Sequence, residues 1–486
     1  MVARKKNKTD DEIIGMKEAL ELLDVTQPTF YRWIREGKIS GNKVGRQWRF
    51  KKADIEGFLR GESPAQKLPS NFDGLISQLE KATQKDVAKE NEKEDVVDYA
   101  VFLLLQLAIE HCASDIHLEP GQPGRIRYRF DGVLHEIVNI EEECSKTLIK
   151  KIKTLAQCNV NINDLPQDGR IQCELMKTKL DIRITFLPTI AGEEAILKLF
   201  SSTENFMDLE KVIAQKNHLA TIKDSLSKSY GLHICCGPTG SGKTTTLYSM
   251  LQSLDHSGNK IITIENPVEY RFPSMTQIQV YPAKGLDMAA AFRSALRGAP
   301  NVLFIGEIHD AITAELALKA ALTGHIVLTQ MHTDDMSSAL TRLLDFGVSP
   351  YLIADSLGVV VSQRLLRKLC PECSKASSLN GDDLKDVKKW AESSGIKFED
   401  LSKEWKSSEG CDACKGTGYK GRISVNEVGT LKPSIIKSMI KEENREALAQ
   451  KIQNEGIINL LGESLRFVSE GKTSLSEIKR VILSSR

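Results

Sequence analysis

The sequence predicts an α/β protein of several domains: a P-loop domain with a parallel sheet, preceded by an α+β domain and a winged helix-turn-helix, with a tetracysteine subdomain. A complete G-x-x-x-x-G-K-T motif at residues 237–244 directly follows an apolar run. Apolar runs then alternate with helical segments, as in parallel α/β sheets. Two C-x-x-C pairs lie further on. The 486 residues provide for about three domains at ~150 residues each.

Composition excludes several classes of protein. The formal net charge is +1 and the pI is about 7.5, so no global field indicates nucleic acid or membrane as a partner. Ten cysteines are too few for a disulfide scaffold in a chain of this length. The first twelve residues lack the apolar segment of a secretory signal. The run Val101–Ile109 is far shorter than the ~20 residues of a transmembrane helix. We therefore expect a soluble cytoplasmic protein.

Residues 13–60 have the pattern of a winged helix-turn-helix. Helical spacing runs from Ile13 to Leu23, and Thr26 with Pro28 predicts the start of a second helix that ends at Gly37. Two short strands and a helix follow, the order in which such modules enter a major groove and touch the backbone.

Positive charge is concentrated in this first module. Residues 25–52 contain a single acidic residue, Glu36, and eight basic residues: Arg32, Arg35, Lys38, Lys43, Arg46, Arg49, Lys51 and Lys52. Local cations of this kind are what phosphate contacts require, so double-stranded DNA is an expected partner. The segment 16–59 resembles the excisionase/MerR-type DNA-binding domain along its length. The alternative is that Trp33 and Trp48 are core residues, the cations a solvated face, and the module a protein-docking domain.

The next two segments carry no catalytic pattern. Residues 61–94 are charged and contain prolines, which predicts a linker with one short helix near 75–83. Residues 95–205 begin with a helix whose apolar face is wide. Alternating strands follow, with Asp131-Gly132 as a hairpin turn. We expect an α+β domain with an antiparallel sheet.

Residues 206–369 contain the predicted phosphate site. The glycines allow backbone N–H groups to surround phosphate oxygens, and the following helix adds its positive end. Lys243 is expected to reach the β- and γ-phosphates, and the Thr244 hydroxyl to bind Mg²⁺. The predicted nucleotide-binding residues are Gly237, Pro238, Thr239, Gly240, Ser241, Gly242, Lys243, Thr244 and Thr245.

Polar residues follow three apolar strands after the P-loop. Glu265 and Glu269 come at the end of the strand 260–265, and Glu307 follows the strand 301–305 after Gly306. A third strand, 325–329, leads to His332. The carboxyl ends of parallel strands meet at one edge of a sheet, so these side chains are expected to hold a metal or a water there.

Four cysteines predict a structural zinc site in the segment 370–425. Cys370 and Cys373 form one knuckle, and Cys411 and Cys414 form another. Two C-x-x-C pairs in a cytosolic chain favour a closed tetrahedral Zn²⁺ site over a redox pair. The ion would clamp a long excursion of the chain. Residues 426–486 are predicted to be helical.

The segment 95–486 resembles the ATPases of type II secretion and type IV pilus assembly. The matching stretches are ASDIHLEP, LPQDGRI and LPTIAGEE before the P-loop, then GPTGSGKTTT, ITIENPVEY, GEIHD and TGHIVLTQMHTDD. The resemblance implies a RecA-like motor that binds ATP and Mg²⁺ and works as a homo-hexamer. It also implies that Arg170, Arg183, Arg293 and Arg297 close on the phosphates. His325 and His332 match the family's His box. The implied partners are pilin or pseudopilin subunits and an inner-membrane platform protein, with the ATPase peripheral at the inner face of the cytoplasmic membrane.

Two departures from the family pattern bear on turnover. Asn266 stands where the family has an aspartate, and His309 where it has an arginine. The P-loop and the flanking glutamates are intact, so nucleotide binding is expected with reduced hydrolysis. A second hypothesis is a DNA-bound regulator whose ATPase acts as an oligomerisation switch. A third is a motor whose first module is a protein adaptor.

Overall fold

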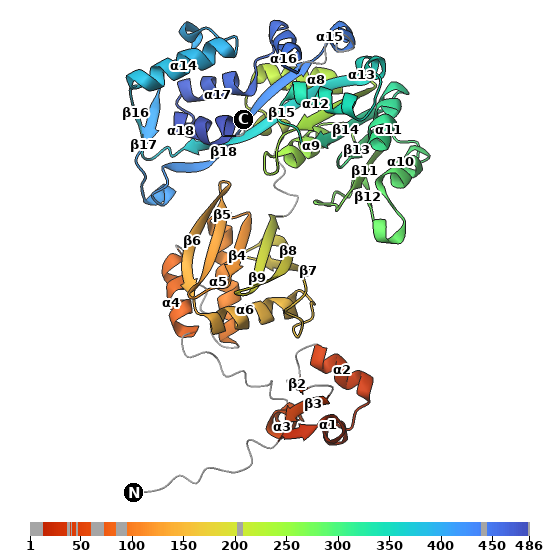
Figure 1. Ribbon diagram of the computed structural model, residues 1–486, viewed down its shortest axis with the longest axis vertical. Coiled ribbons are helices and arrows are strands. Elements are labelled where there is room, and N and C mark those ends of the chain that lie inside the picture. The colour runs from red at the N-terminus through yellow and green to blue at the C-terminus, as the bar shows by residue number, and fades with distance from the viewer. Residues whose placement is uncertain are drawn as a thin grey trace. The chain divides into compact units, whose positions relative to one another are not determined.

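A computed structural model describes residues 13–35, 39, 41–44, 47–59, 72–83, 95–201, 208–438 and 445–484. The chain divides into two compact units, Met1–Ser202 and Thr203–Arg486 (Figure 1). Within the described residues, no helix is both long and apolar enough to cross a membrane.

The first module contains three helices and a small antiparallel sheet of order β1-β3-β2. The sheet consists of β1 (Ile13–Gly15), β2 (Asn42–Val44) and β3 (Gln47–Lys51), and the helices are α1 (Met16–Leu23), α2 (Gln27–Arg35) and α3 (Lys52–Leu59). The prediction of a helix from Ile13 was wrong, because β1 precedes α1 and Ile14 pairs with Phe50. Ile13 is 65% exposed and Ile14 only 1%, the alternation of a strand. Gly37, Lys38 and Arg46 lie outside the described residues.

The second domain is a six-stranded sheet of order β6-β5-β4-β9-β8-β7, in which every neighbouring pair is antiparallel, as predicted. Its hairpin turn is Asp131-Gly132, with φ of 49° and 80°. The elements are α5 (Val96–Glu110), β4 (Asp115–Glu119), β5 (Gly124–Phe130), β6 (Val133–Ile140), α6 (Glu142–Leu155), β7 (Gln167–Leu175), β8 (Thr178–Thr189) and β9 (Gly192–Ser201).

One helix of the predicted linker belongs to this second domain. Helix α4 (Phe72–Ala82) buries Phe72, Leu75 and Leu79 in the same core as α5. The Tyr99 hydroxyl of α5 donates a 3.0 Å hydrogen bond to Glu80. The short helix expected near 75–83 is thus present as α4, and its apolar face packs in the core of the second domain.

The second unit is organised around a seven-stranded sheet of order β12-β11-β13-β14-β10-β15-β18. All neighbouring pairs are parallel except β15–β18. The strands are β10 (Gly231–Cys236), β11 (Ile261–Glu265), β12 (Thr276–Gln279), β13 (Val302–Ile305), β14 (Ile326–Met331), β15 (Leu357–Leu369) and β18 (Tyr419–Thr430). Ile305 pairs with Thr329 and Cys236 with Met331, so β13, β14 and β10 end at one edge.

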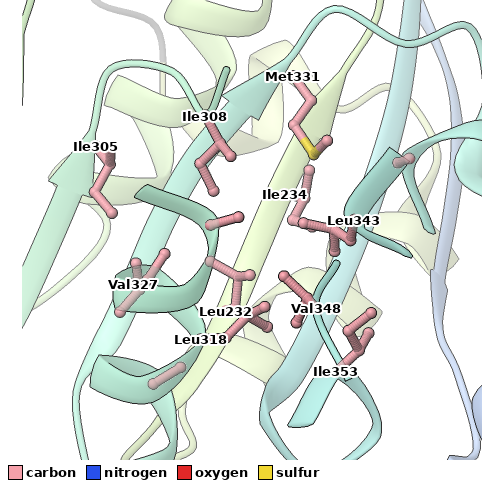
Figure 2. Close-up of a cluster of buried hydrophobic side chains, with 14 of the residues drawn as sticks. Leu232, Ile234, Ile305, Ile308, Leu318, Val327, Met331, Leu343, Val348 and Ile353 are labelled. Atoms are coloured by element: carbon pink, nitrogen blue, oxygen red, sulfur yellow. The ribbon is translucent and has the colours of Figure 1, made fainter. Parts of the chain in front are cut away.

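Helices cover both faces of this sheet. On one face, Leu232 and Ile234 of β10 pack with Ile305, Val327 and residues of α10–α13 (Figure 2). On the other face, the core includes residues of α7–α9. The helices are α7 (Leu209–Val212), α8 (Lys216–Leu226), α9 (Lys243–Gln252), α10 (Met288–Leu296), α11 (Ala311–Leu322), α12 (Met336–Asp345) and α13 (Pro350–Ser356). Because helices bury both faces of the sheet, its central strands are apolar along nearly their whole length.

The C-terminal part returns to the sheet before it becomes helical. Strand β18 pairs with β15 along most of its length, so the predicted boundary at 425/426 cuts through a strand of the sheet. The excursion between them contains β16 (Ser374–Ala376), α14 (Gly381–Ser393) and β17 (Lys406–Ser408). Helices α15 (Pro433–Ser438), α16 (Arg445–Asn454), α17 (Leu460–Ser469) and α18 (Leu475–Ile478), with a π-helix over Lys479–Leu483, follow.

A buried ion pair anchors the end of the chain to β15. Glu477 of α18 is fully buried and accepts hydrogen bonds from the backbone N–H and the guanidinium of Arg367, and from Arg480. Burial raises the pKa of Glu477, but the bonds from Arg480 and Arg367 outweigh this and lower it to about 2. The carboxylate is thus held ionised in the core.

Candidate active site

The P-loop joins β10 to α9, the strand–loop–helix context that the motif predicted. Gly237, Gly240 and Gly242 have φ of 153°, 78° and 86°, values that residues with a Cβ rarely adopt. Among the described residues no side chain caps the amino end of α9, so its first N–H groups can bind an anion. The Ser241 hydroxyl oxygen is buried without a hydrogen-bond partner among the described residues. These features fit a bound phosphate.

The Lys243 side chain folds back onto the P-loop. Its Nζ donates to the backbone oxygens of Gly237 (2.8 Å) and Pro238 (3.0 Å), and the residue is 5% exposed. Burial lowers the pKa of Lys243, while the nearby carboxylate of Glu307 raises it in part. A phosphate between lysine and loop would offer stronger, charge-assisted bonds than these two carbonyls.

Glu307 follows β13 after Gly306, at the edge where the P-loop lies. One carboxylate oxygen is 3.3 Å from Nδ1 of His309 and 3.5 Å from Nε2 of His332. The side chain of Glu307 is partly exposed, which leaves it accessible to a water or a metal. Asp310, the last acid of this motif, caps α11 by accepting from the Thr313 N–H at 2.8 Å. The structure thus brings Lys243, Glu307 and His332 together.

Glu265 is committed to a buried hydrogen-bond network. It is 3% exposed and accepts from the Tyr248 hydroxyl at 2.5 Å and from Thr263 at 2.6 Å. Gln277 approaches the same carboxylate at 3.4 Å and donates to the backbone oxygen of Tyr270 at 2.8 Å. Burial raises the pKa of Glu265, although its donors partly oppose this. Glu269, beyond the strand end, is only half-buried.

The two His-box histidines lie at opposite ends of β14. His332 follows the carboxyl end, whereas His325 precedes the strand and its Nδ1 lies 2.9 Å from the Ala320 carbonyl oxygen. Six residues of strand separate them by roughly 20 Å. His325 is therefore a turn residue, not part of the site beside the P-loop.

The four predicted arginines are carried by different units. Arg170 lies on β7 and pairs with Asp181 of β8, and the Arg183 guanidinium lies 4.7 Å from the centre of the Phe200 ring. Arg293 is exposed in the last turn of α10. Arg297 follows it and donates to Ser294 at 3.1 Å. Arg170 and Arg183 thus lie opposite each other on the paired strands β7 and β8 of the first unit. Arg293 and Arg297 both lie at the carboxyl end of α10 in the second unit.

The four cysteines of the two knuckles form one cluster, with all sulfurs within 4.8 Å of one another. The Sγ–Sγ distances are 3.9 Å for Cys370–Cys411 and 3.8 Å for both Cys373–Cys414 and Cys411–Cys414. A tetrahedral zinc with Zn–S bonds of about 2.3 Å separates its sulfurs by about 3.8 Å, whereas a disulfide needs about 2.05 Å. The residues fit zinc.

Backbone N–H groups near Cys414 favour its thiolate form. Burial raises the pKa of the Cys414 thiol, but backbone N–H groups of Cys411 and Gly418, 3.1 and 3.2 Å from its sulfur, help to lower it to about 6. Cys370 directly follows β15, and Cys414 lies just before β18. An ion bound here would tie together the two ends of the segment that connects β15 to β18.

In the first module, both tryptophans serve the core. The Trp33 ring lies 5.0 Å from Phe58, and the Trp48 ring 6.1 Å from Phe50. This agrees with the alternative interpretation of these two aromatics. Arg32 on α2 and Arg49 on β3 are exposed, so these two cations lie on the surface of the module.

Several positioning residues could not be assigned from sequence. Tyr248 and Gln277 hold Glu265, and Gln363 of β15 contacts the P-loop. For Gln363 the sequence does contain a signal of a special role, because the polar pair Gln363-Arg364 interrupts a long apolar run.

Comparison with known proteins identifies two matching families. Residues 90–480 match the family described as "Type II/IV secretion system protein", and residues 15–63 match "Helix-turn-helix domain". The type IV pilus assembly ATPase PilB of Myxococcus xanthus is 36% identical over 382 residues, 78% of this chain and 66% of that protein. The chain thus spans slightly less than two thirds of that relative. The type II secretion system ATPase E of Vibrio cholerae is 32% identical over 432 residues, 87% of this chain and 84% of that protein.

Solved structures support the fold. The Legionella pneumophila ATPase DotB has a TM-score of 0.58 at 19% identity, covering 79% of this chain and 95% of that one. The pilus retraction motor PilT with bound ADP has a TM-score of 0.51 at 22% identity, covering 78% and 96%. The predicted resemblance is confirmed, and the chain belongs to the type II/IV secretion system protein family, whose relatives named above include pilus assembly and secretion ATPases.

Proposed function

We propose that this chain is an ATP-hydrolysing motor of a type II secretion or type IV pilus assembly system that drives polymerisation of pilin or pseudopilin subunits. The observation that carries the proposal is the convergence of the P-loop, Lys243 and the Glu307–His332 pair at one sheet edge. The working form is a homo-hexamer on an inner-membrane platform protein, at the cytoplasmic face of the membrane.

Each group at the edge has a role that its chemistry supports. Lys243 and the α9 amino end bind the phosphates, and Thr244 and Glu307 hold Mg²⁺, Glu307 through water. The arginines at 170, 183, 293 and 297 neutralise phosphate charge, as the family resemblance implies. The four-cysteine cluster holds one structural Zn²⁺ that fixes the excursion between β15 and β18.

Glu269 is the proposed base that orients the attacking water. A general base must be within hydrogen-bond reach of that water and have a lone pair for its proton. Glu265 meets neither demand well, since it is buried and bound by Tyr248 and Thr263. We assign Glu265 to positioning the loop that carries Glu269.

Complementation of a deletion strain tests this function. Wild-type chain should restore pili or secretion, and Lys243→Ala should restore neither while accumulating to the same level. Lys211→Ala, a change of an exposed lysine of α7, is the matched control and should behave as wild type. Wild-type pilus assembly or secretion in the Lys243→Ala strain would refute the motor function.

A second candidate function is DNA binding by residues 13–60, favoured by the helix-turn-helix match and the exposed Arg32 and Arg49. In this form the chain is a DNA-bound regulator and the ATPase sets its oligomeric state. Full-length chain and a chain lacking residues 1–60 should differ in retention of a duplex at moderate salt. Equal retention, with the first module instead capturing the platform protein, would assign the module to protein docking.

A further inference from the structure

Gln363 lies behind the P-loop at a point where β15 continues past the end of β10. Ser362 is the last residue of β15 that pairs with β10, opposite Cys236. The next residue, Gln363, is 1% exposed. A buried amide costs free energy unless both its ends are hydrogen-bonded, so its partners indicate what it does.

Both ends of the Gln363 amide are bonded to the nucleotide loop. Nε2 donates to the backbone oxygen of Ser241 at 2.7 Å. Oε1 accepts from the hydroxyl of Thr246 at 2.7 Å. A carbonyl oxygen only accepts, which fixes the amide orientation. The two bonds bracket residues 242–245, the junction of the loop with α9.

The loop is also closed against Gln363 sterically. A Cβ at Gly237 would lie 2.6 Å from the backbone oxygen of Gln363, and a Cβ at Gly242 would lie 2.8 Å from its Nε2. Real Cβ atoms do not approach this closely. Gln363 therefore packs directly against two of the three loop glycines, Gly237 and Gly242.

We propose that Gln363 is a positioning residue for nucleotide binding, which holds residues 241–246 in the one arrangement that points the loop N–H groups at the phosphates. It rests on the proposed function, since it assumes ATP at this loop. Without the amide, the loop would sample other conformations and each binding event would have to select the competent one. The effect belongs to affinity rather than to the chemical step.

Nucleotide affinity measured with the full-length chain tests this role. We expect Gln363→Leu to raise the Kd for ADP and the KM for ATP about 10- to 100-fold, with kcat changed less than about threefold. Thr246→Val should raise the Kd about 3- to 10-fold, and Thr246→Ser, which keeps the hydroxyl, should stay within about twofold. The double variant Gln363→Leu/Thr246→Val should bind no more weakly than Gln363→Leu alone.

Ser362→Ala is the matched control, because Ser362 is an equally buried neighbour that contacts Cys236 rather than the loop. It should alter Tm without altering the Kd. An unchanged Kd in Thr246→Val and Gln363→Leu, with only Tm lowered, would overturn the proposal. If Gln363→Leu does not fold, the Thr246 pair decides alone. Loss of ADP binding in Gln363→Leu together with full binding in Lys243→Ala would instead overturn the proposed function.

Discussion

Replacing Glu265 by glutamine tests whether this carboxylate has a structural or a catalytic role. The Tyr248 and Thr263 hydroxyls both donate to this carboxylate, one to each oxygen, at 2.5 and 2.6 Å. A glutamine presents one oxygen and one NH₂ group, so the hydroxyl that faces the NH₂ group can only accept from it, and its own buried O–H loses its acceptor. The variant therefore loses one charge-assisted hydrogen bond and gains one poorly matched contact.

The expected cost is about 1.5–3 kcal/mol, the value of a hydrogen bond to a charged group. For a unit of this size such a loss lowers Tm by roughly 3–12 °C. Tyr248→Phe removes the 2.5 Å bond but keeps the carboxylate, so it should lower Tm by a similar amount. Turnover of ATP in both variants should stay within about tenfold of wild type, because neither removes the group that contacts water.

Thermal unfolding and steady-state ATP turnover measured on Glu265→Gln, Tyr248→Phe and Glu269→Gln decide the matter. Glu269→Gln is expected to lower kcat about 100-fold or more with little change in Tm. A structural role for Glu265 would be refuted if Glu265→Gln abolished turnover at unchanged Tm while Tyr248→Phe remained fully active. That pattern would make Glu265 the base.

Three further expectations concern other parts of the chain. Elemental analysis should find one zinc per chain, and Cys414→Ser should abolish it and lower Tm; zinc retained in Cys414→Ser would exclude the four-thiolate site. Because the pKa of Glu477 is about 2 in the fold against 4.5 for an ordinary glutamate, its contribution of about 3 kcal/mol should be complete above pH ~4.5 and lost as the pH falls toward 2. Glu477→Gln should thus be destabilised at pH 7 and equal to wild type near pH 2. If the first module binds duplex DNA, Arg32→Ala and Arg49→Ala should each reduce the salt slope of binding by about 0.9, and unchanged slopes would exclude phosphate contacts there.

Local signals made much of the site predictable. The P-loop, the strand ends at Glu265 and Glu307 and the paired cysteines are each read from a few adjacent residues, and the structure places them as a parallel sheet requires. The hairpin at Asp131-Gly132 was predictable for the same reason, since a two-residue turn carries its own backbone requirement.

Features that depend on distant partners were not predictable. Strand β18 carries polar residues such as Asn426 and Glu427, and it is a strand of the central sheet only because β15, far earlier in the chain, pairs with it. Helix α4 has too few apolar residues to stand alone, and its place in a core is decided by α5. Gln363 stands in an apolar run, where its contact with Ser241 cannot be inferred without the fold.

Mg²⁺-dependent ATP hydrolysis by the purified full-length chain, measured beside Lys243→Ala, tests whether the P-loop site makes this chain an ATPase. Wild-type chain should hydrolyse ATP with saturation kinetics. Lys243→Ala should lower kcat/KM about 100-fold or more, because it removes the cation that contacts the transferred phosphate. Equal rates for the two proteins, or no hydrolysis and no nucleotide binding by wild type, would contradict an ATP-driven motor.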